Sequence, residues 1–375
     1  MARSRPTKAQ APQMTASSMS HSATDGEPEG AAGHAPAPPQ PPADGHRARG
    51  ARDAGRALLA QDYVGVLAAI VALVVLIGAL RPDFLAFGQL MEILNQATFA
   101  AVLACGMALL LAMRELDLSV GSVYGLTAIA AALLIREGAD PWLASLGAVV
   151  MGAALGLFNG LLIQLLHLSS IVATLATLSM FRGLDLALSH GTQVLGAPQD
   201  DSFSKIVGSQ PLGVPFNVWV LVVLVVVLTV VLRATPFGYR VRSIGSSPEA
   251  AEFSGLPIAR IRLQAFVLMG ALGGLVGVLS LGYFGSADPS LGTGYELLAI
   301  ASAVIGGTSL RGGKATIVGA ALGAILLGVV SSGLTYFDVP INWTSFATGT
   351  VILLAVALDS LLRRRRSSDA RPGLP

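Results

Sequence analysis

Residues 63–80 read YVGVLAAIVALVVLIGAL, an apolar run without a single charged side chain. As a helix, a run of this length crosses the roughly 30 Å hydrocarbon layer of a membrane. Comparable runs recur along the chain as far as residue 361. Because backbone groups in lipid must be satisfied within the protein, and a helix does so within one segment, the sequence predicts an all-α, polytopic transmembrane helical bundle.

The overall composition is typical of a membrane protein. Hydrophobic residues make up 53% of the 375 residues, charged residues only 12%, and the mean hydropathy is +0.68. Soluble domains carry about twice that share of charge. The net charge of +2 says little about partners. The single cysteine, Cys105, excludes an intrachain disulfide and gives no information on compartment.

The apolar runs predict about ten spans within a transmembrane domain of residues 57–362. Their predicted ranges are 63–80, 96–113, 117–135, 142–166, 169–189, 216–233, 263–284, 295–309, 315–335 and 341–361. Residues 1–56 are rich in Pro and Ala and contain almost nothing large and apolar, so we expect a disordered tail rather than a folded domain. A docking role for this Pro-rich tail is the alternative. It lacks the apolar core of a signal peptide.

Basic residues near the ends of the spans predict the orientation. Arginines precede the first span, at 47–56, and a basic tail, residues 363–375, follows the last. Since basic residues accumulate on the cytoplasmic side, both termini are expected in the cytoplasm. With ten crossings, the polar connector 234–262 falls on the same side. Five arginines lie in or beside it: Arg233, Arg240, Arg242, Arg260 and Arg262.

The centre of this connector carries the start and stop signals of a short helix. Ser247 is a suitable N-cap, Pro248 fits the first turn, and Glu249 favours the positive end of the helix. Gly255 and Pro257 are expected to end it. A helix this short is marginal in water by itself. We therefore expect it to pack against something else, most simply a partner protein.

Polar side chains inside the predicted spans are candidates for a solute path, because an unpartnered polar group in hydrocarbon is costly. The candidates are Asn95, Asp117, Asn159, Thr174, Thr177 and Glu296. For Asp117, capping of a helix is an equally good explanation. Arg182 and Asp185 are three residues apart and can pair on one helix face. Their segment is either a full span or a broken helix that lines a cavity.

Two further patterns are interpreted as structural. Glycines four residues apart let helix backbones approach closely, either within the bundle or at a dimer interface or moving seam. They occur at Gly152, Gly156 and Gly160, at Gly270 and Gly274, and at Gly319 and Gly323. The run 307–315 lacks the spacing and the Ser or Thr of a phosphate-binding loop, so we expect a tight turn there. No pattern of metal ligands, or of a nucleophile with its base, is present.

Three ordered motifs give the chain its resemblance to a known family. Residues 249–255 are similar to the EAA-type coupling loop of ABC importer permeases. Residues 116–122 (LDLSVGS) and 295–309 resemble motifs of the ribose-type sugar permeases. The likeness extends over about residues 85–361. The chain departs from the family in its long Pro-rich tail and at Arg114 and Glu115, where small or hydroxyl residues and Gly are usual.

The resemblance implies a permease subunit of a binding-protein-dependent importer in the bacterial cytoplasmic membrane, not an enzyme. Its expected partners are a separate ATPase that holds ATP and Mg, a second permease copy, identical or related, and a periplasmic or lipid-anchored binding protein. No cofactor of its own and no nucleic acid are implied. The residues expected to couple to the ATPase are Ser247, Pro248, Glu249, Ala250, Ala251, Phe253 and Gly255.

The implied cargo is a pentose, a hexose or a polyol. Within the same architecture, an autoinducer-type sugar, a nucleoside or a branched-chain amino acid is the alternative. Two other classes remain open. An ion-coupled secondary transporter would use charges at a broken helix, and residues 182–185 are its best support. A membrane enzyme would need a catalytic constellation that the sequence does not display.

Overall fold

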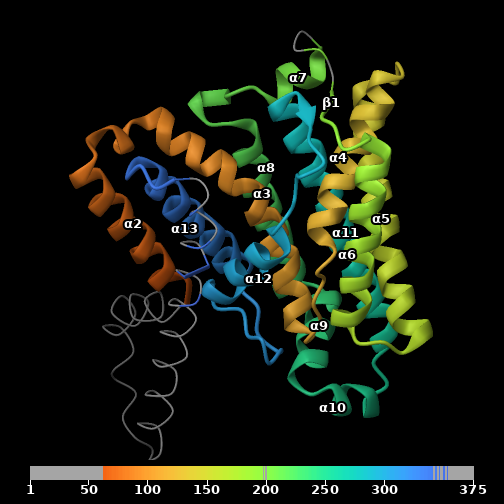
Figure 1. The fold of residues 1–375 in the computed structure, drawn as a ribbon. Coiled ribbons are helices and arrows are strands. Elements are labelled where there is room, and N and C mark those ends of the chain that lie inside the picture. Colours follow the sequence, from red (N-terminus) through yellow and green to blue (C-terminus); the bar gives the residue numbers. More distant parts are fainter. Residues whose placement is uncertain are drawn as a thin grey trace, which may run out of the picture. The chain divides into compact units, whose positions relative to one another are not determined.

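The computed structural model describes residues 62–196, 198 and 201–340, and five single residues after Pro340. Within this part, seven helices are long and apolar enough to cross a membrane. They are α2 (Asp62–Leu80), α3 (Phe87–Ala112), α5 (Pro141–Leu166), α6 (Ser170–Ser189), α8 (Phe216–Ala234), α11 (Ile258–Phe284) and α13 (Ile317–Tyr336). The predicted all-α membrane bundle is confirmed (Figure 1).

Shorter elements complete the described chain. Two apolar helices are α4 (Val120–Arg136) and α12 (Tyr295–Ile305). At one end of the bundle lie η1 (Pro82–Leu85), α7 (Ser202–Val207), η2 (Pro211–Gly213) and the antiparallel strands β1 (Val194–Leu195) and β2 (Ser286–Ala287). At the other end lie α9 (Pro236–Ser246) and α10 (Pro248–Phe253) (Figure 1). We name these two ends the α7 end and the α10 end.

Helix α3 forms the centre of the bundle. Inside its most apolar window 89% of the residues are buried, against 17% for α2 and 22% for α8. The side chains from Phe99 to Met113 are almost completely enclosed. Because α2 and α8 are apolar yet largely uncovered, lipid or another subunit must cover them in a membrane.

Glycines bring α5 and α11 into backbone contact. Gly152 and Gly156 on α5 face Gly270 and Gly274 on α11, and a Cβ at any of these positions would meet the opposite backbone. Gly319 and Gly323 on α13 likewise lie against the backbone of α12 and the residue that follows it. The interpretation of these spacings as close helix packing is therefore confirmed within the described bundle.

The structure corrects two predictions about the spans. The span predicted at 96–113 begins earlier, at Phe87. The expectation of a full crossing over 295–309 is wrong, because α12 has 11 residues and covers only about 16 Å at 1.5 Å per residue. The predicted span 341–361 lies almost entirely outside the described residues. The number of ten spans and the location of both termini therefore stay predictions.

The span predicted at 169–189 is a continuous helix, α6. Its alternative, a broken helix, is thus set aside. Breaks occur elsewhere, at the connector 113–119 before α4 and at the connector 288–294 before α12. The two breaks meet, because Gly121 and Gly292 pack backbone to backbone with no room for a Cβ. In Figure 1 the chain reaches the start of α12 well inside the bundle.

Candidate functional site

The short helix α10 forms as its sequence predicts. The Ser247 hydroxyl accepts a 3.3 Å hydrogen bond from the Ala250 amide, and Pro248 occupies the first turn. Gly255 has a φ of 71°, a left-handed conformation that costs glycine little, and it ends the helix. The predicted start and end of this helix are confirmed.

One face of α10 is anchored and the other is free of described neighbours. Ala251 is 4% exposed and packs into the main core. Phe253, by contrast, is 94% exposed, and Glu249 and Ala250 are exposed beside it. Fully exposing a large aromatic side chain forfeits its burial energy, of about 1.5–3 kcal/mol. Such a residue at the tip of a protruding helix is typical of a contact with another protein.

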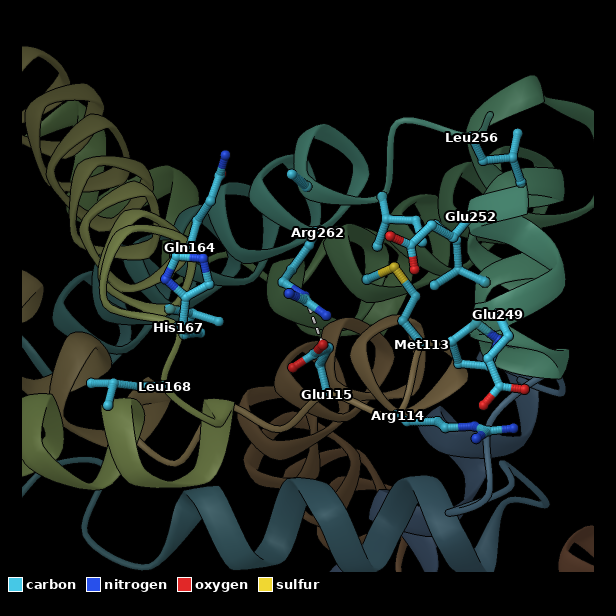
Figure 2. Close-up of a pocket in the computed structure, with 15 residues that line it drawn as sticks. Met113, Arg114, Glu115, Gln164, His167, Leu168, Glu249, Glu252, Leu256 and Arg262 are labelled. Carbon is cyan, nitrogen blue, oxygen red and sulfur yellow. Dashed lines mark ion pairs between the residues drawn. The ribbon is translucent and has the colours of Figure 1, made fainter. Parts of the chain in front are cut away.

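A cleft of about 730 Å³ separates α10 from the ends of the membrane helices. Figure 2 shows its charged lining: Glu249 and Glu252 come from α10, Arg114 is drawn just below Glu249, and Glu115 and Arg262 lie together at the centre of the view. The carboxylate of Glu115 lies 2.7 Å from Nε of Arg262. The cleft is therefore lined by both acidic and basic side chains, next to the short helix α10.

The end of α3 is fastened to the end of α9. Arg114 donates from Nε to the Gly245 carbonyl (2.9 Å) and from Nη2 to the Ser246 carbonyl (3.2 Å). The Gly313 amide donates to the Ala112 carbonyl at 2.8 Å. Gly313 belongs to the turn 309–314, whose two glycines have positive φ. The prediction of a tight turn there is confirmed.

Five of the six residues predicted to line a path gather around the start of α4. Ser119 donates to Oδ1 of Asp117 from its amide (2.9 Å) and its hydroxyl (2.7 Å). Asn159 on α5 donates to the same hydroxyl at 2.7 Å. Thr174 on α6 accepts from the Leu118 amide at 3.0 Å. These side chains are buried, and neither described cleft is lined by them.

The remaining path candidates lie around and beyond this group. Thr177 is buried one turn after Thr174 and donates to its carbonyl at 3.3 Å. The Glu296 carboxylate reaches Gly121, on the first turn of α4. Asn95 does not join them, because it lies on α3 and accepts a 3.0 Å hydrogen bond from Asn217 on α8. Whether any of the six contacts a solute stays a prediction.

Arg182 and Asp185 pair at 3.3 Å, as their spacing on a helix predicts. Arg182 also donates to the carbonyls of Pro289 (2.8 Å) and Leu291 (2.9 Å) in the connector before α12. The arginine thus ties this connector to α6. The pair has a structural role in the described conformation.

Sequence reasoning missed a second cleft, of about 700 Å³, between α3, α12 and α13. Its polar lining includes Gln89, Glu92 and Gln96 on α3 and Ser331, Ser332 and Thr335 on α13. Glu92 accepts hydrogen bonds from Gln96 (2.7 Å) and from the Tyr283 hydroxyl (2.8 Å). The spacing of the three α3 residues, three and then four apart, was the available signal. It was lost because the span was expected to begin only at residue 96.

Known proteins similar to this chain show which class of membrane protein it belongs to. Residues 89–356 match the family described as branched-chain amino acid transport system / permease component. The chain belongs to this family of permeases. It is 34% identical over 296 residues to the ribose import permease protein RbsC of Escherichia coli (strain K12), an alignment that covers 78% of the permease and 92% of the relative.

Two further relatives agree. Over 302 residues the permease is 34% identical to the L-arabinose ABC transporter permease protein AraH of Azospirillum brasilense, with 80% and 88% of the two chains covered. Over 305 residues it is 32% identical to the D-allose transport system permease protein AlsC of Escherichia coli (strain K12), with 81% and 93% covered. No solved structure matches the chain.

The resemblance drawn from the three motifs is therefore confirmed. The permease is a transport component rather than an enzyme, and a multi-pass protein of the bacterial inner membrane.

Proposed function

We propose that this permease is the membrane-spanning subunit of an ABC importer that carries a sugar, a pentose, hexose or polyol, into the cell. The observation that carries the proposal is its likeness, over most of both chains, to permeases named for ribose, L-arabinose and D-allose. All three names are those of monosaccharides. They favour a sugar over the branched-chain amino acids in the description of the family.

Energy enters through α10. The helix has an anchored face at Ala251 and an exposed face with Phe253, so a push on the tip moves the helix as a unit. The residues of this contact are Ser247, Pro248, Glu249, Ala250, Ala251, Phe253 and Gly255. A separate ATPase subunit binds ATP and Mg, and its closure displaces α10. A rigid lever of this kind suits a gate with two states.

The α10 end faces the cytoplasm, where such an ATPase resides. Arg240 and Arg242 on α9 lie at this end, together with Arg260 and Arg262 at the start of α11 and Arg311 in the turn beside them. Basic residues that flank spans favour the cytoplasmic side. On this orientation the α7 end receives the solute from a periplasmic or lipid-anchored binding protein.

The remaining partners follow from the same class of importer. A second permease copy, identical or a paralogue, completes the pore. The permease itself binds neither nucleic acid nor a cofactor, since ATP and Mg belong to the ATPase. Solute passes near the two breaks, where Asp117, Asn159, Thr174, Thr177 and Glu296 gather. The first four of these side chains are buried and Glu296 is partly buried, which corresponds to a closed path in the described conformation. Asn95 is the outermost candidate.

The ion-coupled alternative loses its main support. It relied on charges at a broken helix, with residues 182–185 as its best support. In the structure α6 is continuous, and Arg182 is satisfied by Asp185 and two backbone carbonyls.

Reconstitution tests the proposal. The permease is co-expressed with its ATPase and binding protein, which are to be sought in the adjacent reading frames, and the complex is placed in liposomes. The binding protein is screened against ribose, arabinose, allose and leucine by thermal shift, since a ligand that binds the folded state raises its stability. We expect uptake of one labelled sugar that requires both ATP and the ATPase.

A protonophore is the control for ion coupling. With ATP held constant it should leave the uptake rate unchanged. Uptake by the permease alone, or loss of uptake on adding the protonophore, would overturn the proposal. Uptake of leucine in preference to every sugar would overturn the assignment of the cargo.

A further inference from the structure

The connector between α3 and α4 begins with two charged residues in an unusual position. Arg114 has a φ of 65°, in the left-handed region that side-chain-bearing residues rarely adopt. Glu115 follows it and is nearly buried, with a side chain 10% exposed. A strained backbone and a buried carboxylate persist only where the surrounding contacts hold them.

Arg114 holds the chain just before α10. Its two hydrogen bonds reach the carbonyls of Gly245 and Ser246, the last residues of α9. These carbonyls lie at the negative end of α9, where a cation is favoured. Ser246 directly precedes Ser247, the N-cap of α10. The guanidinium therefore fixes the point from which α10 starts.

Glu115 holds the chain just after α10. Its partner Arg262 lies on the first turns of α11, which begins at Ile258, five residues beyond the end of α10. Ion pairs between fully exposed side chains contribute little. This pair joins a side chain 10% exposed to one 34% exposed, at 2.7 Å, so solvent screens it less.

The same connector is tied to the membrane helices on its other side. The Leu116 amide donates to the Ser170 hydroxyl at 3.2 Å, and the Leu118 amide donates to Thr174 at 3.0 Å, both on α6. Ser119 is bonded to Asn159 on α5. A displacement of residues 114 and 115 is therefore passed within five residues to the start of α4.

We propose that Arg114 and Glu115 are positioning residues that fasten the two flanks of α10 to the connector before α4, so that movement of α10 moves the break at which α4 begins. The inference rests on the proposed function. It adds the physical link between the coupling helix α10 and the solute path near the start of α4. Arg114 controls the entry to α10 and Glu115 its exit. The pair acts as a two-point clamp, and either point alone lets α10 tilt without moving the connector.

The test uses two variants, one at each end of the clamp. The first also relieves backbone strain, whereas the second leaves the backbone unchanged. Arg114→Gly removes the guanidinium and also relieves the backbone, because glycine accepts a positive φ. Glu115→Gln removes the charge that Arg262 faces. Both are measured in the reconstituted complex as sugar molecules imported per ATP hydrolysed. We expect about a three- to tenfold loss in each, the range typical of coupled contacts, with thermal stability of Arg114→Gly equal to or above the wild type.

Arg260→Gln is the matched control, because Arg260 is exposed on the same turns of α11 as Arg262. It should keep the wild-type ratio of sugar to ATP. The charge exchange Glu115→Arg with Arg262→Glu should recover at least half of the loss. A wild-type ratio in both single variants would overturn the inference, and so would an equal loss in Arg260→Gln.

A second readout separates this inference from the proposed function. A spin label on Ser254→Cys reports the mobility of α10, and the native Cys105 is completely buried and so does not compete for the label. We expect a more mobile label in Arg114→Gly and in Glu115→Gln, and an unchanged label in Arg260→Gln. Equal mobility in all four proteins would refute the clamp even if transport is observed. A label that is more mobile in Arg114→Gly and Glu115→Gln than in the wild type would support the clamp. If the wild type then imports no sugar, the proposed function is rejected while the clamp stands.

Discussion

Asn159, two turns before the end of α5, donates a 2.7 Å hydrogen bond to the hydroxyl of Ser119, at the break before α4. That hydroxyl in turn donates to Asp117, and all three side chains are buried. In a bundle this apolar, each buried polar group depends on the next for its partner. The three residues therefore act as one unit that sets where α4 begins.

Replacing Asn159 by Leu is expected to destabilise the protein by about 1–3 kcal/mol, because Ser119 and Asp117 then lose part of a buried network. The measurement is thermal unfolding of the purified permease in detergent or nanodiscs. Gln164→Leu makes the same chemical change on the same helix at an exposed position and should have little effect. Equal melting temperatures for the two variants would contradict a linked network.

Replacing Arg182 should destabilise the protein more than replacing its partner Asp185. Arg182→Leu leaves the fully buried carboxylate of Asp185 unpaired and two carbonyls of the α12 connector without a donor, at a cost of about 3 kcal/mol. Asp185→Asn removes the buried charge while Arg182, 20% exposed, keeps both carbonyls, at about 1 kcal/mol.

Thermal unfolding compares the two variants. Arg136→Leu is the control, because Arg136 pairs with Glu137 in an exposed position, where ion pairs contribute little. A larger loss of thermal stability in Asp185→Asn than in Arg182→Leu would contradict the anchoring role of the arginine.

Local signals allowed part of this architecture to be predicted. The cap, first turn and terminal glycine of α10 act within a few residues, so Ser247, Pro248 and Gly255 are enough to define the helix. The pairing of Arg182 with Asp185 follows from helical spacing alone. In the same way, the glycines of α5 and α11 predict close packing, although they do not say which helices meet.

Two features could not be read from local patterns. An apolar segment of suitable composition predicts a span whether it crosses fully or starts halfway, so the short α12 was taken for a complete crossing. The contacts of Arg114 and Glu115 join residues far apart in sequence, Gly245 and Arg262. No periodicity encodes such pairs, and the two charges before Leu116 were noted only as a departure from the family.

Gly156→Leu should disrupt the seam between α5 and α11. A Cβ at Gly156 falls against the Phe266 carbonyl, which is backbone and cannot turn aside. Overpacking typically costs about 1–3 kcal/mol, and a backbone clash lies at the upper end. Gly147→Leu, on the same helix with nothing within 4 Å of its Cβ, is the matched control. Size-exclusion chromatography should show less correctly folded protein, and thermal unfolding a lower melting temperature, for Gly156→Leu but not for Gly147→Leu.

Gly255→Ala should impair coupling while sparing the fold. A methyl group added at this position meets no neighbouring atom. The only cost is that of holding alanine at a positive φ of 71°, about 1 kcal/mol of folding free energy. That cost falls on α10 alone, since the transmembrane helices do not depend on this turn. We expect normal membrane insertion and a lower ratio of sugar imported to ATP hydrolysed. Gly138→Ala shares the positive φ and the open surroundings at the other end of the bundle, and should leave this ratio unchanged.

Phe253 should carry much of the binding energy for the ATPase subunit. Its side chain is 94% exposed, so Phe253→Ala removes no contact within the permease and should leave its stability unchanged. An aromatic residue that becomes buried at the centre of an interface contributes about 2 kcal/mol or more, which corresponds to roughly a 30-fold weaker complex. The dissociation constant of the purified permease and ATPase measures this directly.

Leu212→Ala is the matched control for Phe253, because Leu212 is 90% exposed at the opposite, α7 end. If the ATPase binds α10, Leu212→Ala leaves the dissociation constant unchanged while Phe253→Ala raises it. Equal affinity for both variants would place the ATPase contact elsewhere on the permease. A loss confined to Leu212→Ala would reverse the orientation inferred from the arginines, because the ATPase and the α7 end would then share one side of the membrane.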